Sequence, residues 1–263
     1  MRDEVRRRLV ALNSEFYQTF AEAFSETRRR VQPGVRRALE GIAATASVLD
    51  LGCGPGNLAN ALAVHGHVGF YAGLDGSERL LNIARLETDH PTAVFLQSAL
   101  TEPSWTEHLA QHLATAQAGR RVEAFRNHSH RFDRVCAFAL IHHLPGAEQR
   151  LRFVRQAAGL LEEGGAMAVS VWDFLSSPRF RGRIVPWETI GLTEGDVEEG
   201  DYLLDWRRGG HGLRYVHLFS EDGLASLAQS CQLRTIETYR SDGQNRRMAM
   251  YALWQKQIQS LDP

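Results

Sequence analysis

The chain has 263 residues, of which 43% are hydrophobic and 23% are charged, and its formal net charge is −1. This length and composition are ordinary for a globular protein with one large α/β domain or two small domains. A charge so close to zero excludes a global electrostatic attraction to nucleic acid or to a membrane surface.

Three cysteines, Cys53, Cys136 and Cys231, form an odd and scattered set. Such a set favours reduced thiols in a cytoplasm over a disulfide framework. The chain has no C-x-x-C pair of the kind that binds zinc, so we predict no metal site. The N-terminal segment lacks an apolar h-region, and no apolar run is long enough to span a bilayer. We therefore expect a cytoplasmic location and no membrane partner.

Residues 1 to about 45 are predicted to be helical, because apolar residues recur there at three- and four-residue steps and Pro33 should open a second helix. From residue 46 onward, apolar strands alternate with amphipathic helices. We predict strands at 47–52, 68–76, 93–100, 132–140, 165–174, 213–219 and 248–255, and helices at 56–66, 77–87, 147–161 and 220–231. This alternation indicates an α/β fold with βαβ units and a mostly parallel sheet.

The chain is therefore divided into an N-terminal helical cap at 1–45 and an α/β domain at 46–263. Two stretches interrupt the alternation in that domain. Residues 103–131 are predicted to form an extended crossover helix. Residues 176–212 contain two prolines and seven acidic residues and are too long for a plain connection. We predict that they form a lid or a substrate-facing insertion.

Three glycines, Gly52, Gly54 and Gly56, follow the first predicted strand at alternate positions. In open α/β sheets, ligands bind beyond the carboxyl ends of the strands, and glycine lets a ligand touch the main chain. The following helix N-terminus favours negative charge. The dinucleotide fingerprint is G-x-G-x-x-G, whereas here Asn57 stands at the third glycine position. This spacing makes NAD a less favoured ligand.

Asp75 ends the second predicted strand, 25 positions after Asp50. An acid at this place can accept hydrogen bonds from both hydroxyls of a ribose. The alternative interpretation is a helix cap, although Ser77 could also serve as the cap. Because the glycine loop and Asp75 both occur at the expected strand ends, we favour the role of ribose acceptor for Asp75.

The motifs "VLDLGCGPGN", "GLDGSERLL", "FDRVCAFALIHHL" and "LLEEGGAMAVSVW" together resemble class I S-adenosylmethionine-dependent methyltransferases over about residues 46–175. The resemblance implies a Rossmann-like, seven-stranded sheet with helices on both faces and an antiparallel last strand. It also implies S-adenosyl-L-methionine as cofactor. The family's usual acid after the third strand is replaced here by Ala99, so adenine would depend on main-chain contacts and apolar packing. The predicted cofactor contacts are Tyr17, Asp50, Gly52, Cys53, Gly54, Gly56, Asn57, Asp75, Gly76, Ser98, Ala99, Leu100 and Phe138.

The flanking segments narrow the resemblance. "LNSEFYQTFAEAFSETRRRVQPGVRRAL", "VPW" and "RYVHLFSEDGL" are similar to tRNA wobble-uridine methyltransferases, which methylate the carboxylate of a carboxymethyl-uridine. A carboxylate nucleophile has no proton to lose and needs only orientation by donors. An amine or hydroxyl acceptor would instead need a base, such as His142 or its neighbour His143. The candidate acceptor-side residues are Arg28, His142, Arg214, Tyr215 and His217.

Several alternatives remain open at this point. Runs of arginine near the N-terminus could bind the phosphates of tRNA, but the acidic 176–212 stretch would repel them. A small-molecule carboxylate or an N- or O-methyl acceptor is therefore the alternative to tRNA modification. A small activating protein partner is possible within this resemblance. A non-enzymatic interpretation is a cofactor-binding module that supports a partner subunit, although the intact "GCGPG" and Asp75 argue against it.

Overall fold

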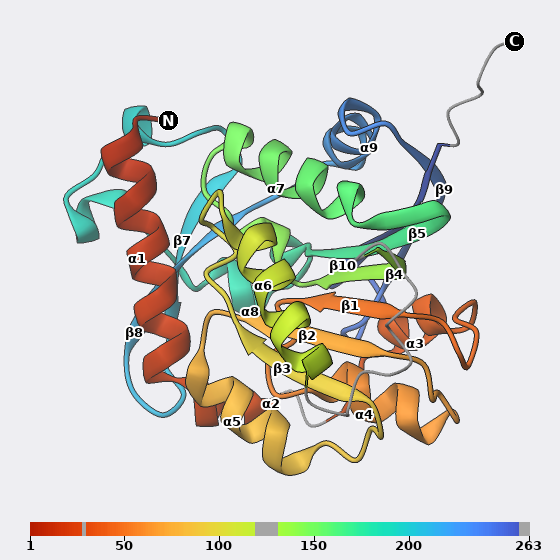
Figure 1. The fold of residues 1–263 in the computed structure, drawn as a ribbon. Helices are drawn as coiled ribbons and strands as arrows, with labels where there is room; N and C mark the ends of the chain where they lie inside the picture. The colour runs from red at the N-terminus through yellow and green to blue at the C-terminus, as the bar shows by residue number, and fades with distance from the viewer. Residues whose placement is uncertain (28–29, 119–130, 258–263) are drawn as a thin grey trace, which may run out of the picture.

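A computed structural model describes residues 1–27, 30–118 and 131–257 (Figure 1). Its centre is a seven-stranded sheet of order β3-β2-β1-β4-β5-β10-β9. The strands are β1 Val48–Leu51, β2 Tyr71–Asp75, β3 Ala93–Gln97, β4 Phe132–Phe138, β5 Leu161–Trp172, β9 Leu233–Ser241 and β10 Ala249–Lys256. Strand β10 runs antiparallel to both of its neighbours, and the other pairs are parallel. The predicted Rossmann-like sheet with an antiparallel last strand is confirmed.

Helices cover both faces of this sheet. On one face, α6, α7 and α9 pack apolar residues against the strands in a core that includes Trp105, Phe153 and Leu224. On the other face, α3 and α4 pack against Val48 and Tyr71. The helix bounds are α1 Asp3–Thr19, α2 Ala21–Thr27, α3 Pro33–Leu39, α4 Asn57–Val64, α5 Glu78–Glu87, α6 Trp105–Ala118, α7 Ala147–Gly159, α8 Pro178–Arg181 and α9 Glu221–Ser230. Pro33 stands at the first position of α3, where its missing N–H costs nothing.

A second, smaller sheet was not anticipated. It has the order β6-β7-β8, with β6 at Ile184–Val185, β7 at Asp201–Trp206 and β8 at Gly212–His217. All its pairs are antiparallel. Helix α1 lies beside it (Figure 1), and Val5 and Leu9 of α1 share a core with Trp187, Leu203 and Tyr215. The stretch 176–212, predicted as an insertion, thus supplies two of the three strands that support the N-terminal helix.

Two sequence predictions fall partly beyond the described ranges. Helix α6 covers 105–118 of the crossover helix predicted at 103–131, and residues 119–130 lie outside the described residues. Arg28 also lies outside them. Among the described residues, no helix is both long enough and apolar enough to cross a membrane. Over the same ranges, no three His, Cys, Asp or Glu side chains gather as a metal site would require.

Two buried histidines, His67 and His90, join the loops that precede β2 and β3. The ring Nε2 of His67 lies 2.8 Å from the carbonyl oxygen of Ala46, so this nitrogen carries the proton that it donates. His67 Nδ1 must then accept from His90 Nε2, which is 2.8 Å away. His90 Nδ1 in turn accepts from the Thr92 N–H at 3.3 Å. The chain of bonds therefore holds both rings neutral.

We expect acid to destabilise the fold through this pair. Burial lowers the pKa of His67, and burial together with His67 lowers the pKa of His90 to about 4, below the ordinary value near 6.5. Below pH ~6.5 the unfolded chain binds more protons than the folded one, so the free energy of unfolding should fall as the pH drops toward 4. Each histidine can lower the free energy of unfolding by at most about 1.4 kcal/mol per pH unit.

Urea denaturation of the wild type and of His90→Gln between pH 7 and pH 5 measures this effect. The variant should lose less stability than the wild type over that interval. His65→Gln provides the control, because it removes a histidine from the exposed surface and leaves the buried pair intact. Equal slopes in all three proteins would contradict the expectation.

Candidate functional site

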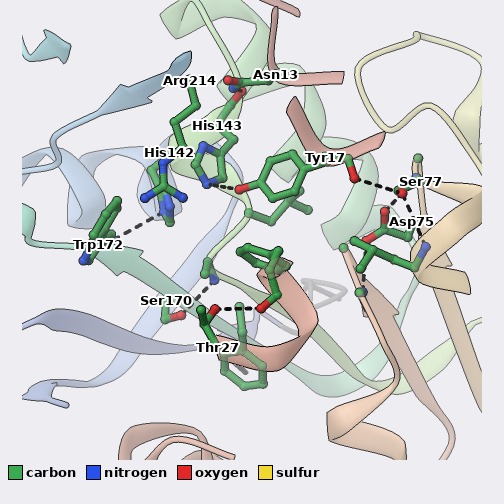
Figure 2. A pocket seen from close by; sticks show the side chains of 18 of the residues that line it. Asn13, Tyr17, Thr27, Asp75, Ser77, His142, His143, Ser170, Trp172 and Arg214 are labelled. Atoms are coloured by element: carbon green, nitrogen blue, oxygen red, sulfur yellow. Dashed lines mark hydrogen bonds between the residues drawn. The ribbon is translucent and has the colours of Figure 1, made fainter. Parts of the chain in front are cut away.

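A cavity of ≈ 1200 Å³ lies at the carboxyl ends of β1, β2 and β4, with α1 and α2 along its other side (Figure 2). This is the edge of a parallel sheet at which ligands bind. Residues from the glycine loop after β1, the ends of β2 to β5, the N-terminal helices and β8 line the cavity. It is larger than a typical small-molecule pocket and can hold a cofactor and a second molecule.

The glycine loop after β1 forms the floor of the cavity. Gly52, Gly54 and Gly56 have φ angles of 75°, 53° and 80°, which is the left-handed region that side chains disfavour. A Cβ on Gly56 would lie 2.6 Å from Thr88 Oγ1, so this glycine is also required by packing. Gly52, Cys53, Gly54 and Asn57 line the cavity, whereas Gly56 does not.

The carboxylate of Asp75 is held beside this loop. Asp75 Oδ2 accepts from the Gly54 N–H at 2.9 Å, and Oδ1 accepts from the Ser77 N–H at 2.8 Å. Burial raises the pKa of Asp75, and the backbone N–H groups of Ser77, Gly54 and Gly76 oppose that rise. Ser77 itself caps α5, because its Oγ accepts from the Leu80 N–H. The helix-cap alternative for Asp75 is therefore wrong, and its carboxylate is turned toward the cavity.

A second carboxyl, that of Asp50, lines the same floor. The Tyr71 hydroxyl donates to Asp50 Oδ2 at 2.6 Å. Burial raises the pKa of Asp50 to about 7, with the bond from Tyr71 opposing the rise and the charge of Asp75 adding to it. A positively charged ligand beside Asp50 would stabilise its ionised form. Burial also raises the pKa of the Cys53 thiol, which disfavours its thiolate form.

The segment after β3 closes the cavity at one end. Gly76, Ala99 and Leu100 line it, as does Phe138 at the end of β4. Ser98 is buried and does not line the cavity, and its N–H donates to the Asp75 carbonyl at 3.0 Å. Of the residues predicted to contact the cofactor, Ser98 and Gly56 are thus the two that the structure places outside the cavity wall.

At the opposite end, Arg214 of β8 is surrounded by aromatic rings. Its guanidinium carbon lies 4.6 Å from the ring centre of Trp172, 5.4 Å from that of Phe16 and 5.5 Å from that of Trp206. The side chain is buried, yet it lines the cavity. A desolvated guanidinium of this kind is a strong ligand for an anion, and a planar fork suits a carboxylate.

Both histidines after β4 line the cavity near Arg214 (Figure 2). The Trp172 N–H donates to Nδ1 of the buried His142 at 3.3 Å. His143 Nδ1 lies 3.1 Å from the Tyr215 carbonyl oxygen, and its Nε2 lies 2.7 Å from the Tyr17 hydroxyl. Nδ1 of His143 therefore carries the proton, and Tyr17 donates to Nε2. His143, which the sequence offered beside His142 as a possible base, connects the N-terminal helix to β8.

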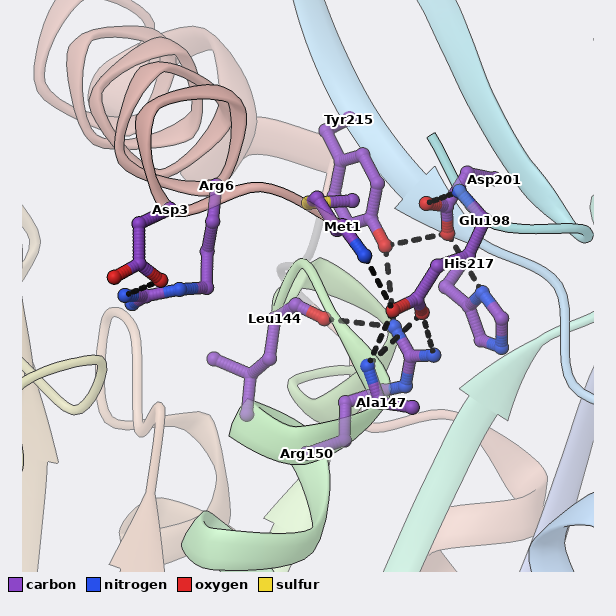
Figure 3. Close-up of polar contacts among 10 residues, drawn as sticks. All are labelled: Met1, Asp3, Arg6, Leu144, Ala147, Arg150, Glu198, Asp201, Tyr215 and His217. Atoms are coloured by element: carbon purple, nitrogen blue, oxygen red, sulfur yellow. Dashed lines mark hydrogen bonds and ion pairs between the residues drawn. The ribbon is translucent and has the colours of Figure 1, made fainter. Parts of the chain in front are cut away.

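Tyr215 and His217 correct the sequence prediction. Side chains alternate across a strand, so both point to the face of β8 opposite Arg214. Figure 3 shows them in a separate cluster, in which Asp201 Oδ1 accepts from the Tyr215 hydroxyl at 2.6 Å and lies 2.8 Å from His217 Nδ1. Arg150 also donates to the Tyr215 hydroxyl, at 3.2 Å. Neither residue lines the cavity with Arg214.

Additional arginines surround the mouth of the cavity on the Arg214 side. Arg183 and Arg207 both pair with the buried Asp205, at 3.4 and 2.6 Å, and Arg208 pairs with Glu26 at 3.0 Å. Arginines therefore outnumber acids at this mouth. The lining arginines there are Arg30, Arg179, Arg183, Arg207, Arg208 and Arg214. Such a mouth favours an anionic ligand.

A comparison with known families gives a match over most of the chain. A family model described as "Methyltransferase domain" matches residues 23–238. A methyltransferase-named protein of Encephalitozoon cuniculi is 26% identical over 223 residues, which span 84% of this chain and 87% of that protein.

Two other relatives match in part. A ubiquinone biosynthesis O-methyltransferase of Coxiella burnetii is 28% identical over 47% of this chain, and a Bos taurus protein named tRNA methyltransferase 9B is 25% identical over 71%. The match spans under half of each of these relatives, at 42% and 35% of their lengths.

Solved structures share the fold at low sequence identity. A Burkholderia thailandensis 1,6-didemethyltoxoflavin-N1-methyltransferase, solved with S-adenosylhomocysteine, superposes with a TM-score of 0.59 at 14% identity, covering 96% of this chain and 91% of that one. A Haloferax volcanii methyltransferase, solved with the Trm112 activator, gives 0.54 at 14% identity and 99% coverage of both chains. The chain belongs to the methyltransferase-domain family and is an S-adenosylmethionine-dependent methyltransferase.

Proposed function

We propose that this enzyme methylates a carboxylate-bearing acceptor whose anionic group is bound by Arg214. The main support for this proposal is the position of Arg214, which is buried among three aromatic rings and still lines the cavity. Among the described residues, it is the arginine most completely withdrawn from water at the acceptor end. A buried, planar guanidinium binds an anionic group more strongly than an uncharged one, so a carboxylate suits this end of the cavity.

The cavity floor fits S-adenosylmethionine, which supplies a methyl group on a sulfonium when bound. Asp75 would accept from the ribose hydroxyls with the lone pairs that Gly54 and Ser77 leave open. Asp50 would face the cationic methionyl part, and Leu100 after β3 would pack against adenine. The bare backbone at Gly52 and Gly54 permits the close approach that such a ligand needs.

A carboxylate acceptor makes the remaining side chains sufficient for the reaction. It has no proton to lose, so its oxygen needs only to be held in line with the methyl carbon. Arg214 supplies the fixed donors for that orientation. No base is needed for such an acceptor, and two ring nitrogens that could serve as one are already engaged: His142 Nδ1 accepts from the Trp172 N–H, and His143 Nε2 accepts from Tyr17.

The finer proposal concerns the acceptor itself. The 25% identity to a protein named tRNA methyltransferase 9B supports a tRNA acceptor. The resemblance of the flanking segments to wobble-uridine methyltransferases narrows this proposal to a uridine that carries a carboxymethyl group. The arginines at the cavity mouth would then face the adjoining phosphates. The similarity to a ubiquinone biosynthesis enzyme supports a small-molecule acceptor instead. A small activating partner is a further proposal, which the structural likeness to the Trm112-bound enzyme suggests.

Labelling separates these acceptors. The protein is incubated with methyl-labelled S-adenosylmethionine and either total tRNA or a metabolite extract of low molecular mass, with boiled protein as the control. Label in nuclease-sensitive tRNA supports the wobble uridine, and label in the small fraction supports a small acid. Failure to label either fraction would count against the proposed function.

The cofactor assignment predicts which nucleotide-containing ligand the protein binds. S-adenosylhomocysteine should bind with a dissociation constant on the order of micromolar, and NAD should not bind, because Asn57 follows a G-x-G-x-G loop. Calorimetry with each ligand measures this directly. A protein that bound S-adenosylhomocysteine and transferred no methyl group to any fraction would support the alternative of a silent partner subunit. Binding of NAD alone would overturn the cofactor assignment.

A further inference from the structure

A polar side chain, Asn13, interrupts the apolar face of α1. The buried residues of that helix are Val5, Leu9, Asn13 and Phe16. Asn13 is only 6% exposed. Burial of a carboxamide is costly unless its hydrogen bonds are replaced. The partners of Asn13 therefore show what this residue contributes.

Asn13 makes three hydrogen bonds, all of them to backbone groups. Its Oδ1 accepts from the Tyr215 N–H at 2.8 Å. Its Nδ2 donates to the carbonyl oxygens of Tyr215 and His143, both at 3.1 Å. Strand β8 is an outer strand of the small sheet, since it pairs with β7 alone. The carboxamide thus takes the place of a neighbouring strand at the open edge of β8.

These bonds hold the two segments that carry the acceptor end of the cavity. Arg214 is the residue before Tyr215, and its side chain points to the opposite face of β8 from that of Tyr215. His143 follows the cavity-lining His142. One turn further along α1, Phe16 packs against the Arg214 guanidinium. A single helix therefore fixes β8, the loop after β4 and one wall around Arg214 (Figure 2).

We propose that Asn13 is a positioning residue for acceptor binding, which acts by fixing the backbone of β8 beside Arg214. The inference rests on the proposed function, in which Arg214 binds the anionic acceptor. Asn13 also lines the cavity, but its carboxamide is bonded to backbone groups, so we expect it to act on the acceptor through β8. Its loss should therefore weaken acceptor binding far more than cofactor binding, because the cofactor contacts at Gly54 and Asp75 lie at the other end of the cavity.

Asn13→Leu and Asn13→Asp test this inference, with Glu15→Ala as the control on the exposed side of the same helix. The acceptor probe is 5-carboxymethyluridine with labelled S-adenosylmethionine, and calorimetry with S-adenosylhomocysteine reports cofactor affinity. Asn13→Leu should raise the KM for the probe at least tenfold and leave cofactor affinity within twofold. Faster hydrogen exchange at residues 212–217 would report the released edge of β8.

Asn13→Asp provides a readout that a merely structural role would not give. A protonated Asp has the same shape as Asn and can accept from Tyr215 while donating to one carbonyl oxygen. Burial beside two carbonyl oxygens raises the pKa of this carboxyl above its ordinary value. His143, Tyr17 and Arg214 also face this region, so the KM is expressed relative to the wild type at each pH. The ratio should be near one at pH 5.5 and rise severalfold by pH 8.

The outcomes separate the inference from the proposed function. If the wild type methylates the probe and the Asn13 variants match Glu15→Ala in KM at every pH, the inference is overturned and the proposed function stands. If cofactor affinity falls as much as acceptor binding, Asn13 acts on the whole fold and the inference is also overturned. A wild type that neither binds nor methylates the probe would contradict the carboxymethyl-uridine form of the proposed function. Unchanged hydrogen exchange at residues 212–217 in Asn13→Leu would then overturn the inference by itself.

Discussion

Arg214→Met should lower the kcat/KM for the anionic acceptor by about thirty- to a thousandfold, which corresponds to about 2–4 kcal/mol. The methionine retains an apolar stem among Phe16, Trp172 and Trp206 but removes the pre-placed donors. Because the guanidinium is buried, no water replaces its bonds to the acceptor at low cost. S-adenosylhomocysteine affinity should stay within about twofold, since the cofactor lies at the other end of the cavity.

The matched control is Arg234→Met, which removes a positive charge from the exposed face of β9. Arg214→Lys separates charge from geometry, because lysine keeps the charge and loses the planar fork. We expect the lysine variant to be intermediate. Steady-state kinetics with the acceptor identified by labelling measures all three. An Arg214→Met enzyme with wild-type kcat/KM would remove the basis for the carboxylate assignment.

Asp75→Ala should weaken S-adenosylhomocysteine binding about ten- to a hundredfold, or about 1.5–3 kcal/mol. The substitution removes the charged acceptor for the ribose hydroxyls. It also leaves the Gly54 and Ser77 N–H groups without their present partner. Part of the loss should therefore reflect a loosened glycine loop. Asp75→Asn, which keeps an acceptor oxygen, should lose less affinity for S-adenosylhomocysteine than Asp75→Ala.

Isothermal titration of the variants tests this expectation. Glu78→Ala is the control, because it removes an acid only three residues further along, at the exposed start of α5. Thermal denaturation without ligand shows whether Asp75→Ala remains folded. An affinity equal to that of Glu78→Ala would mean that Asp75 organises the loop and does not bind the ribose.

The sequence predicts the central sheet well because its signals are local. The apolar runs of β1 and β2 end at an acid and a glycine, and β1, β2 and β4 are each followed by a helical pattern. The left-handed glycines at 52, 54 and 56 follow from the same short motif. The cofactor end of the cavity, built from Gly54 and Asp75, lies next to these elements and was predictable for the same reason.

The acceptor end was less predictable because distant segments build it. Strands β6 and β7 lie in a stretch rich in glycine, proline and acids, and their pairing with β8 is not visible in any local pattern. Tyr215 and His217 were grouped with Arg214 on resemblance, although the two-residue period of a strand places them on the opposite face. Strand β9 was missed because its middle residues are largely polar and half-exposed. Asn13 could have been noticed in the sequence only as a polar residue within the apolar stripe of the N-terminal helix.

The chemical nature of the transferred methyl group tests the central claim most directly. Label is transferred from methyl-labelled S-adenosylmethionine to the acceptor, and the purified product is then held in mild alkali. A methyl ester hydrolyses under these conditions, so our account predicts that the label is released as volatile methanol and that Arg214→Met forms little of this product. Label that stays on the acceptor in alkali would show an N-methyl or ether product, and it would contradict methylation of a carboxylate.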